Sequence, residues 1–573
     1  MKKTNYPLYT PMKFDNFKEL ITLAAEKEEK VAFKYRYEKE ILEVSYKDFK
    51  TEVDSLAKGI MSENLDLGNV AILGENSYRW INIFLSLLCT RGTAVPVDKD
   101  LPEDQMLYVL DTSDCDVIFY SETFDEFVKK HESVLSKVKK FVKFKSDEPS
   151  KKWVEGDTKE KFITLESLFV KGKNQKNEEY KNLTFDKDDI KLIVFTSGTT
   201  GTAKGVMLTV ENISTCINGG LSLANLEGTC LSVLPYHHTY ASVCDILGGI
   251  DSHVTICINE NIRSVPLNLK TFKPDYMFLV PRYLEVFHER ILKEAERTGK
   301  LPLLQKMIKV SNSLLKVGID MRGVFFKSVR EAFGGNVKAL LSGGALLRPD
   351  LGDFFESIGI PVVIGYGITE CSPLVCANRN EFYDVRTIGL PLPNVELEID
   401  SPNEEGIGEI KVKSSIVMKG YYKNEEATRE VIKDGWFYTG DYGKINELGQ
   451  VSITGRKKNI IVLSNGKNVY PEEIETYIAT IPAVEEVVVY SLENDKGDET
   501  ALCAEIYMNP ENVEKLGLKK AADKIKYITE EVRQVLYALP SYKQIRKIVI
   551  RDREFEKTTT KKIKRNLINK QKA

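Results

Sequence analysis

The sequence predicts an α/β protein, with a large N-terminal domain of helix-covered, mostly parallel sheets and a small α+β unit at the C-terminus. Two observations support this prediction. Short apolar, β-branched runs alternate with helical segments between residues 14 and 130, and later runs end abruptly in glycine-rich turns. A chain of 573 residues is also long enough for about three or four domains of roughly 150 residues.

The first part of the chain has clear start signals for helices. Asp15 is placed to cap a first helix, Ser45 with Asp48 resembles a capping box for a second, and Ser77 and Pro102 open two more. Residues 129–187 are rich in Lys and Glu with weak periodicity, which predicts a solvated excursion between two subdomains. Strands are expected at 31–35, 41–45, 70–73, 94–97 and 117–120.

The middle of the chain repeats the alternation. A strand at 231–234 ends in Pro-Tyr-His-His, at a strand end where α/β folds place ligand pockets. His237 and His238 could be metal ligands, although the spacing supplies no third ligand, or they could form an aromatic pocket wall. Helices are expected from Pro281 and over 303–317 and 324–333, and strands at 337–341 and 361–364 run into glycine-rich turns.

The most informative stretch is the buried strand 191–195 and the loop TSGTTGTAK that follows it at 196–204. Its glycines let the backbone approach a ligand closely, its hydroxyls lie beside free N–H groups, and Lys204 adds a cation, which together suit a polyphosphate. It is not the P-loop of nucleotide hydrolases, because Lys204 stands between Ala203 and Gly205. No G-x-G-x-x-G opens a helix here. A mobile surface loop remains the alternative.

Composition excludes several classes. The net charge of −3 gives no global basic field for nucleic acid. The nine cysteines include no CxxC pair, which argues against a zinc site or a disulfide framework. The N-terminus is not a secretory signal, and the apolar run 80–89 is too short to span a membrane. We therefore expect a cytoplasmic protein, with peripheral membrane contact through the basic C-terminal tail as a further hypothesis.

Taken in order, the turns match one pattern: TSGTTGTAKG (196–205), SGGA (342–345), GYGITE (365–370), YTGD (438–441) and GRKK (455–458), with a late Lys562. This pattern resembles the adenylate-forming superfamily of acyl-CoA synthetases, adenylation domains and luciferases. VPRYLEVFHERI (280–291), the helices that follow it and the stretch 458–475 are similar to long-chain fatty acyl-CoA synthetases.

The resemblance implies an ATP site with Mg²⁺. The loop with Lys204 would hold the β- and γ-phosphates, Thr369 would bond the α-phosphate, and Glu370 would bind the metal, a role that suits a hard oxygen ligand. Tyr366 would offer an aromatic face to adenine, and Asp441 would accept the ribose hydroxyls. The nucleotide residues so implied are Thr196, Ser197, Gly198, Thr199, Thr200, Gly201, Gly343, Gly344, Ala345, Tyr366, Gly367, Thr369, Asp441 and Arg456.

The resemblance also implies an AMP-binding N-terminal domain over 1–457 and a mobile C-terminal lid over 458–573, with a hinge near Lys458. The lid would bring Lys562 in for adenylation and then rotate to admit the thiol of coenzyme A, with Gly466 near that thiol. The stretch around Lys562 departs from the commoner P-K-T-x-x-G-K, because Glu556 replaces Pro and Lys561 replaces Gly. Lys561 and Lys562 therefore both remain candidates. The acyl site would include His238, Tyr240 and Gly248.

The function so implied is ATP-dependent activation of a fatty acid, expected to be long-chain, to an acyl-adenylate, and then transfer to coenzyme A with release of AMP and pyrophosphate. One alternative is a ligase that loads an acyl carrier protein. Another is a silent lipid-binding homologue, disfavoured by the intact motif residues. A nucleic-acid ligase is excluded because no K-x-D-G motif lies at the nucleotide site. The partners expected are therefore small molecules.

Overall fold

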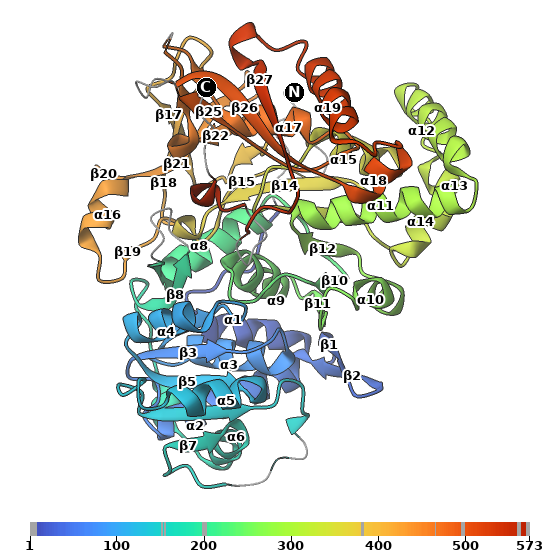
Figure 1. Ribbon diagram of the computed structural model, residues 1–573. Helices are drawn as coiled ribbons and strands as arrows, with labels where there is room; N and C mark the ends of the chain where they lie inside the picture. The colour runs from blue at the N-terminus through green and yellow to red at the C-terminus, as the bar shows by residue number, and fades with distance from the viewer. Residues whose placement is uncertain are drawn as a thin grey trace. The chain divides into compact units, whose positions relative to one another are not determined.

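The computed structural model (Figure 1) describes residues 9–150, 153, 156–196, 203–379, 383–464, 466–493, 499–557 and 563–568, without the side chains of 493, 500 and 566. The chain divides into two compact units. The first consists of Met1–Leu397 and Val412–Phe437, and the second of Glu398–Lys411 and Tyr438–Ala573.

One sheet of the first unit carries the root of the predicted phosphate loop. Over the described residues it has eight strands, parallel from β8 to β7, with β9 and β19 added antiparallel at one edge. In spatial order they are β19 (Gly420–Tyr421), β9 (Lys204–Thr209), β8 (Ile190–Thr196), β4 (Thr93–Val97), β3 (Asn69–Leu73), β5 (Cys115–Ser121), β6 (Lys140–Phe144) and β7 (Phe162–Thr164).

The other sheet of this unit carries the remaining glycine-rich turns. Its described strands are parallel from β14 to β1, so the turns after β13 and β14 and the segment after β10 all leave from the same edge. In spatial order they are β16 (Leu390–Pro391), β15 (Leu374–Ala377), β14 (Val362–Gly367), β13 (Ala339–Ser342), β12 (Tyr276–Leu279), β10 (Thr229–Ser232), β11 (Thr255–Ile258), β1 (Val31–Tyr37) and β2 (Glu40–Ser45).

The first three helices begin where the sequence predicts, with one shift in a capping residue. Ser45 caps α2 (Tyr46–Ser62) and Ser77 caps α3 (Tyr78–Leu88), each accepting from a backbone N–H three residues on. Helix α1 (Phe17–Ala24) is capped by Asn16, not Asp15, because the Asn16 amide oxygen accepts from the Glu19 N–H. Every side chain of α3 is buried, as expected of a helix in contact with β3 and β4.

The predicted solvated excursion at 129–187 is wrong. This stretch contributes β6 and β7 to the sheet and a helix, α6 (Leu165–Asn174), that crosses α2 at close range. A Cβ at Gly59 would lie 2.0 Å from the Leu168 carbonyl oxygen, and one at Gly172 would lie 1.9 Å from that of Ser55. Several of the Lys and Glu residues that suggested a loop, such as Lys173 and Glu179, are exposed.

The helical segment between β12 and β13 follows the prediction except at its end. It contains α11 (Pro281–Arg297) and α12 (Leu301–Lys316) as expected. The single helix expected over 324–333 is instead two short ones, α13 (Arg322–Phe325) and α14 (Lys327–Ala332). Helix α15 (Pro349–Ser357) follows β13.

The second unit is α+β, as predicted. Strands β17 (Glu396–Asp400), β18 (Gly408–Lys413) and β21 (Trp436–Ile445) lead into it, and β22 (Val451–Arg456) pairs with β21. Buried Ile474 and Ile528, on two of its helices, share one apolar core. The remaining elements are β23 (Ile461–Val462), β24 (Asn468–Val469), α17 (Pro471–Ile478), β25 (Val484–Glu493), β26 (Glu499–Met508), α18 (Pro510–Lys515), α19 (Ala521–Val535) and β27 (Ile545–Arg551).

The fold class predicted from sequence, with mostly parallel, helix-covered sheets, is thus confirmed. Within the part of the chain that the structure describes, no helix combines the length and the apolar character needed to cross a bilayer.

Candidate active site

The root of the predicted phosphate loop is a β-hairpin. Thr196, the last residue of β8, pairs with Lys204, the first residue of β9. Strand β19 then adds to β9, with Tyr421 opposite Val206. The loop residues Ser197, Gly198, Thr199, Thr200 and Gly201 lie outside the described residues. The hairpin nevertheless shows that both ends of the loop lie at one sheet edge.

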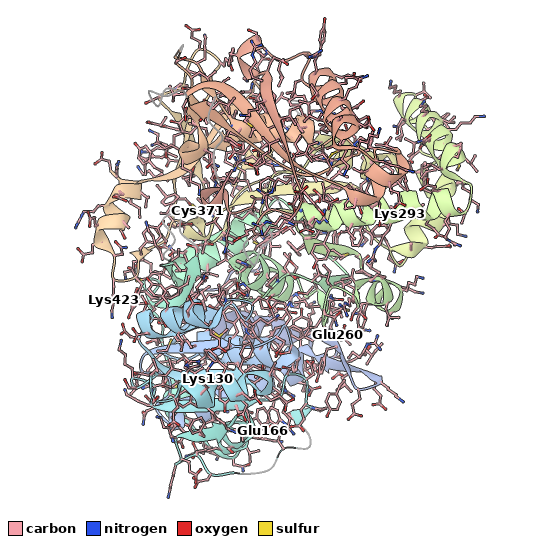
Figure 2. All side chains as sticks on the ribbon, in the orientation of Figure 1. Lys130, Glu166, Glu260, Lys293, Cys371 and Lys423 are labelled. Atoms are coloured by element: carbon pink, nitrogen blue, oxygen red, sulfur yellow. The ribbon has the colours of Figure 1, made fainter. Side chains whose placement is uncertain are left out.

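Glu370 lies beside this hairpin although it follows a strand of the other sheet. It belongs to the short helix η5 (Thr369–Cys371), which contacts β9. The Tyr421 hydroxyl donates to Glu370 Oε1 at 2.8 Å, and the Met418 N–H donates to the Glu370 carbonyl oxygen at 2.8 Å. Figure 2 labels the next residue, Cys371. The segment 418–421 thereby connects the two sheets at the candidate phosphate site.

Tyr421 also contacts the predicted cation. The ammonium of Lys204 lies 5.1 Å from the centre of the Tyr421 ring, within cation–π range. Burial, and after it the charge of Glu370, raises the pKa of Tyr421, so the phenol stays a neutral hydrogen-bond donor. Tyr421 was not predicted from the sequence. A signal was available, since a Gly-Tyr-Tyr run follows a short apolar stretch, but no local pattern ties it to residue 370.

The turn after β13 exposes part of its backbone. Gly344 (φ +79°) and Ala345 are exposed, while Gly343 is buried against Tyr240. A Cβ on Gly343 would lie 3.1 Å from Cζ of Tyr240, whose hydroxyl donates to the Leu341 carbonyl oxygen at 2.9 Å. The structure therefore brings together a residue of the predicted nucleotide set and one of the predicted acyl set.

The turn after β14 is tight. A Cβ on Gly367 would lie 2.3 Å from the carbonyl oxygen of Pro373, so only glycine fits there. The adjacent Tyr366 is 7% exposed. Thr369, predicted to bond the α-phosphate, is half-buried at the start of η5, next to Glu370.

The segment after β10 contains the two adjacent histidines. Their rings lie 4.3 Å apart, and His237 Nε2 lies 3.4 Å from Asp98 Oδ2. Burial lowers the pKa of His237 to about 3, so the imidazole is neutral. Among the described residues, no group of three or more His, Cys, Asp or Glu side chains is arranged to hold a metal ion.

A π-helix, η4 (Tyr240–Leu247), follows the histidines and leads directly into α9 (Gly248–Asp251). Such helices are rare and frequently mark functional sites. Tyr240 stands at its start, and Gly248, predicted for the acyl site, is the buried residue at its end. Nothing in the sequence pattern indicated π-helical winding.

The second unit holds the predicted ribose residues. Asp441 and Arg456 are cross-strand partners on β21 and β22, and Arg456 Nε lies 2.8 Å from Asp441 Oδ1. The carboxylate is nearly buried, while the guanidinium is 44% exposed. Asp441 was expected in a tight turn but lies within β21, one residue after Gly440, whose φ is positive (+69°).

Four further predicted residues belong to the second unit. Lys458 lies in the short helix η6 (Lys457–Asn459), where partial burial, together with Arg456 and Arg565, lowers its pKa. Gly466 has φ +77°, is exposed, and has no atom within 4 Å of where a Cβ would stand. Lys561 and Lys562 lie outside the described residues. The domain boundary at 457/458 and the hinge stay predictions.

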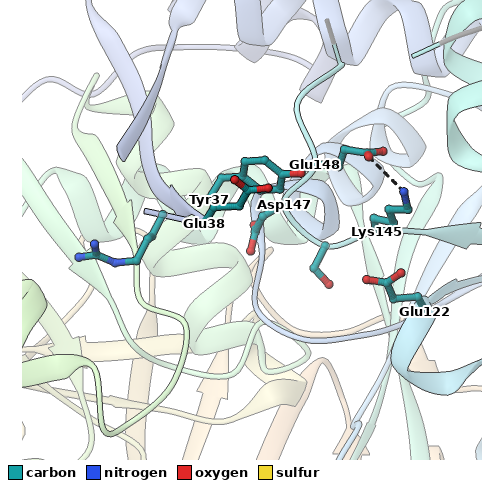
Figure 3. A pocket seen from close by; sticks show the side chains of 8 residues that line it. Tyr37, Glu38, Glu122, Lys145, Asp147 and Glu148 are labelled. Atoms are coloured by element: carbon teal, nitrogen blue, oxygen red, sulfur yellow. Dashed lines mark hydrogen bonds and ion pairs between the residues drawn. The ribbon is translucent and has the colours of Figure 1, made fainter. Parts of the chain in front are cut away.

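A separate cavity of about 510 Å³ lies near β1 and β6 (Figure 3). It contains none of the predicted site residues. Lys145 and Glu148 form an ion pair at 3.1 Å on its wall, and burial raises the pKa of Asp147 to about 6. Four of its eight lining residues are acidic and two are basic, which disfavours a carboxylate ligand such as a fatty acid. It is lined by Arg36, Tyr37, Glu38, Glu122, Lys145, Ser146, Asp147 and Glu148.

Known proteins resemble this chain over most of its length. The family described as "AMP-binding enzyme" matches residues 22–422, and "AMP-binding enzyme C-terminal domain" matches residues 458–572. The chain is 28% identical over 566 residues to the long-chain-fatty-acid–CoA ligase FadD15 of Mycobacterium bovis, covering 92% of this chain and 90% of that protein. It is 29% identical over 509 residues to fatty acyl-CoA synthetase B of Dictyostelium discoideum, covering 84% and 74%.

Among solved structures, the chain is similar to the anthranilate CoA ligase AuaEII in complex with anthranoyl-AMP. The TM-score is 0.75, with 19% sequence identity, over 99% of this chain and 98% of that one. At this identity the likeness establishes the fold. The substrate of that enzyme is not evidence for the substrate of this chain.

Proposed function

The chain belongs to the AMP-binding enzyme family, and from that premise we propose that it activates a long-chain fatty acid with ATP and transfers the acyl group to coenzyme A. Its enzyme class is that of the AMP-forming acid–CoA ligases, which use ATP and coenzyme A. The long chain of the acid is the proposal. Supporting it are curated relatives named as long-chain-fatty-acid–CoA ligases over most of the chain.

The observation that carries the proposal is the convergence of Lys204, Tyr421 and Glu370. Three segments far apart in sequence bring a cation, a neutral donor and a carboxylate to the mouth of one hairpin loop. A carboxylate at the mouth of a phosphate-binding loop would repel phosphate unless a metal ion lay between them. This arrangement therefore fits a metal-bound polyphosphate better than a simple anion.

In this reaction the protein has to supply positive charge and to orient the substrates, more than to form covalent bonds itself. The acid's carboxylate oxygen attacks the α-phosphorus, and the bond from that phosphorus to the bridging oxygen of pyrophosphate breaks. Lys204 and the loop N–H groups would offset the charge on the departing pyrophosphate, and Thr369 would orient the α-phosphate. The coenzyme A thiolate then attacks the acyl carbon, and AMP leaves with the electron pair.

Glu370 is the residue that would hold Mg²⁺. Glu370 Oε1 accepts from Tyr421, which leaves the other carboxylate oxygen to face a cation. One carboxylate with the phosphate oxygens of the nucleotide is a usual magnesium environment, because this ion retains waters and seldom occupies an all-protein cage. Bound there, Mg²⁺ would neutralise phosphate charge.

The deciding experiment measures AMP and pyrophosphate from ATP with fatty acids of graded chain length, with and without coenzyme A. We expect turnover that needs both the acid and coenzyme A and that increases toward long chains. Acid-dependent pyrophosphate exchange without any effect of coenzyme A would instead indicate a carrier-protein acceptor. Absence of any acid-dependent signal would favour the silent lipid-binding homologue.

A further inference from the structure

The segment 300–327, which comprises α12, α13 and the turn between them and is called here the α12 arm, exposes aliphatic side chains. Leu303, Val310 and Val317 are spaced by seven residues, about two helical turns, so they form one stripe. Val317 is 71% exposed and Val324 is 68% exposed. Ile319 is also exposed. Large aliphatic side chains gathered on one surface often mark an interaction site.

The other face of α12 holds the arm in place. Leu304 and Ser311 are buried, and the Asn312 side chain donates to the Ser357 hydroxyl of α15 at 3.0 Å. The exposed stripe is therefore not the core-facing side of a helix that has swung away. It is a second apolar surface on an anchored helix.

The net charge of the α12 arm is also opposite in sign to that of the whole chain. Residues 300–327 include six basic residues and one acidic residue, a net charge of +5, whereas the whole chain carries −3. The single acid, Asp320, is already paired with Arg322 at 2.8 Å. Within the described residues, Lys306, Lys309 and Lys316 have no carboxylate in ion-pair range. Figure 2 labels Lys293 on α11, next along the chain before the arm.

Aliphatic side chains beside unpaired lysines match the surface of an anionic bilayer. The lysine stems can lie along apolar surface while their ammonium groups reach the head groups, and interfacial helices combine apolar insertion with attraction to anionic lipid. A protein partner would need a groove that is both apolar and acidic, whereas an anionic membrane offers both properties over any area. We propose that the α12 arm binds the surface of membranes that contain anionic lipid.

The site is distinct from the basic C-terminal tail, which the sequence analysis singled out for membrane contact. It lies between β12 and β13 in the chain, and β13 runs into the glycine-rich turn at 342–345. If the proposed function holds, such contact would keep the enzyme where a long-chain acid is dissolved. The binding itself does not depend on that function.

The test is co-sedimentation of the full chain with vesicles of phosphatidylcholine, with or without phosphatidylglycerol, at several salt concentrations. Each lysine near an anionic surface contributes about fivefold to binding, so Lys306→Gln with Lys309→Gln should weaken binding by about 30-fold at low salt. Leu303→Ser with Val317→Ser should also weaken it, because apolar insertion is lost.

A matched control removes one exposed aliphatic and one lysine elsewhere, by Val134→Ser with Lys130→Gln. Val134 is 63% exposed, but Lys130 is paired with Glu103 at 2.6 Å and is labelled away from the arm in Figure 2. We expect the control to bind vesicles within about twofold of the wild type, because a paired lysine adds little field.

Three results would overturn the proposal: arm variants that bind vesicles as the wild type does, equal binding to vesicles without phosphatidylglycerol, or arm variants that lose a dimer in sedimentation velocity. The last would show that a second copy covers the stripe.

AMP production from a water-soluble short-chain acid, measured on the same variants, should stay at the wild-type rate. A failure of the proposed ligase function would therefore be distinguished from a loss of vesicle binding.

Discussion

At the scale of single residues, the phenol of Tyr421 is the least expected part of the site. Its hydroxyl orients Glu370, so Tyr421→Phe removes one donor and keeps the ring under Lys204. A hydrogen bond to a charged group contributes roughly 1.5–3 kcal/mol. We expect acid-dependent ATP–pyrophosphate exchange to slow by about tenfold to a hundredfold, with more Mg²⁺ needed for the half-maximal rate.

The neighbouring Tyr422 supplies the control. Its hydroxyl donates to Asp114 Oδ2 at 3.0 Å, and among the described residues it makes no hydrogen bond to Glu370. Tyr422→Phe should leave the exchange rate and its Mg²⁺ dependence unchanged. If both variants lost activity equally, disturbance of the strand pairing would explain the loss, and the orienting role of Tyr421 would be rejected.

A second residue-scale prediction concerns Asp251, at the end of α9. Its Oδ1 accepts from the Met12 N–H at 3.3 Å, and its buried Oδ2 has no hydrogen-bond partner among the described residues. Burial raises its pKa from 3.8 to about 7. Folding is therefore favoured by this group below pH 3.8, and that contribution is lost as the pH rises to about 7.

Asp251→Asn should accordingly raise the free energy of unfolding. The gain grows between pH 3.8 and about pH 7 and is constant above that. At about 1.36 kcal/mol per pKa unit, the gain is on the order of 4 kcal/mol at most. Denaturant midpoints at about pH 5 and about pH 8 test it. Asp320→Asn is the opposite control, because Arg322 lowers the pKa of Asp320 to about 2. A stabilisation by Asp251→Asn that did not grow with pH would refute the assignment.

At the scale of elements, the crossing of α2 and α6 depends on two glycines. Gly59→Ala would place a methyl group 2.0 Å from the Leu168 carbonyl oxygen, and neither helix backbone can move without disturbing the sheet beneath. We expect a loss of about 1–3 kcal/mol or more, as for other overpacked interiors. Thermal unfolding measures it.

Gly323→Ala in α13 is the matched change, because no atom lies within 4 Å of its Cβ position and its φ is not positive. It should be neutral or stabilising by up to about 1 kcal/mol, the helix preference of Ala over Gly. Equal melting temperatures for Gly59→Ala and the wild type would mean that the two helices do not cross as closely as described.

The sequence predicted local features of the structure and missed those that depend on distant residues. Caps such as Ser45 and Ser77 act on N–H groups three residues away, so local pattern located them correctly. Helix α6 was missed because its charged residues, Glu166, Lys171 and Lys173, mask a short apolar face. Tyr421 was missed because its partner, Glu370, is 51 residues away, a separation at which periodicity carries no information.

At the scale of the whole molecule, the proposed function divides into two half-reactions that use different residues of the C-terminal part. Lys562→Ala should abolish acid-dependent pyrophosphate exchange, because the lysine would offset charge on the attacked phosphate. The same variant should still convert pre-made acyl-adenylate and coenzyme A to acyl-CoA. Lys561→Ala should spare both steps. If it instead reproduced the loss, Lys561 would be the residue that acts.

Gly466 should show the reverse pattern, if its loop borders the thiol. Gly466→Leu should slow acyl-CoA formation from pre-made adenylate and leave pyrophosphate exchange intact. Any side chain at φ +77° strains the backbone, so Gly517→Leu is needed beside it: Gly517 also has a positive φ (+68°) and open space around it. Both variants then carry a similar backbone cost and differ only in where the side chain projects. A thiolation defect in Gly466→Leu alone would place coenzyme A at that loop, whereas equal defects would show that strain in the second unit was responsible.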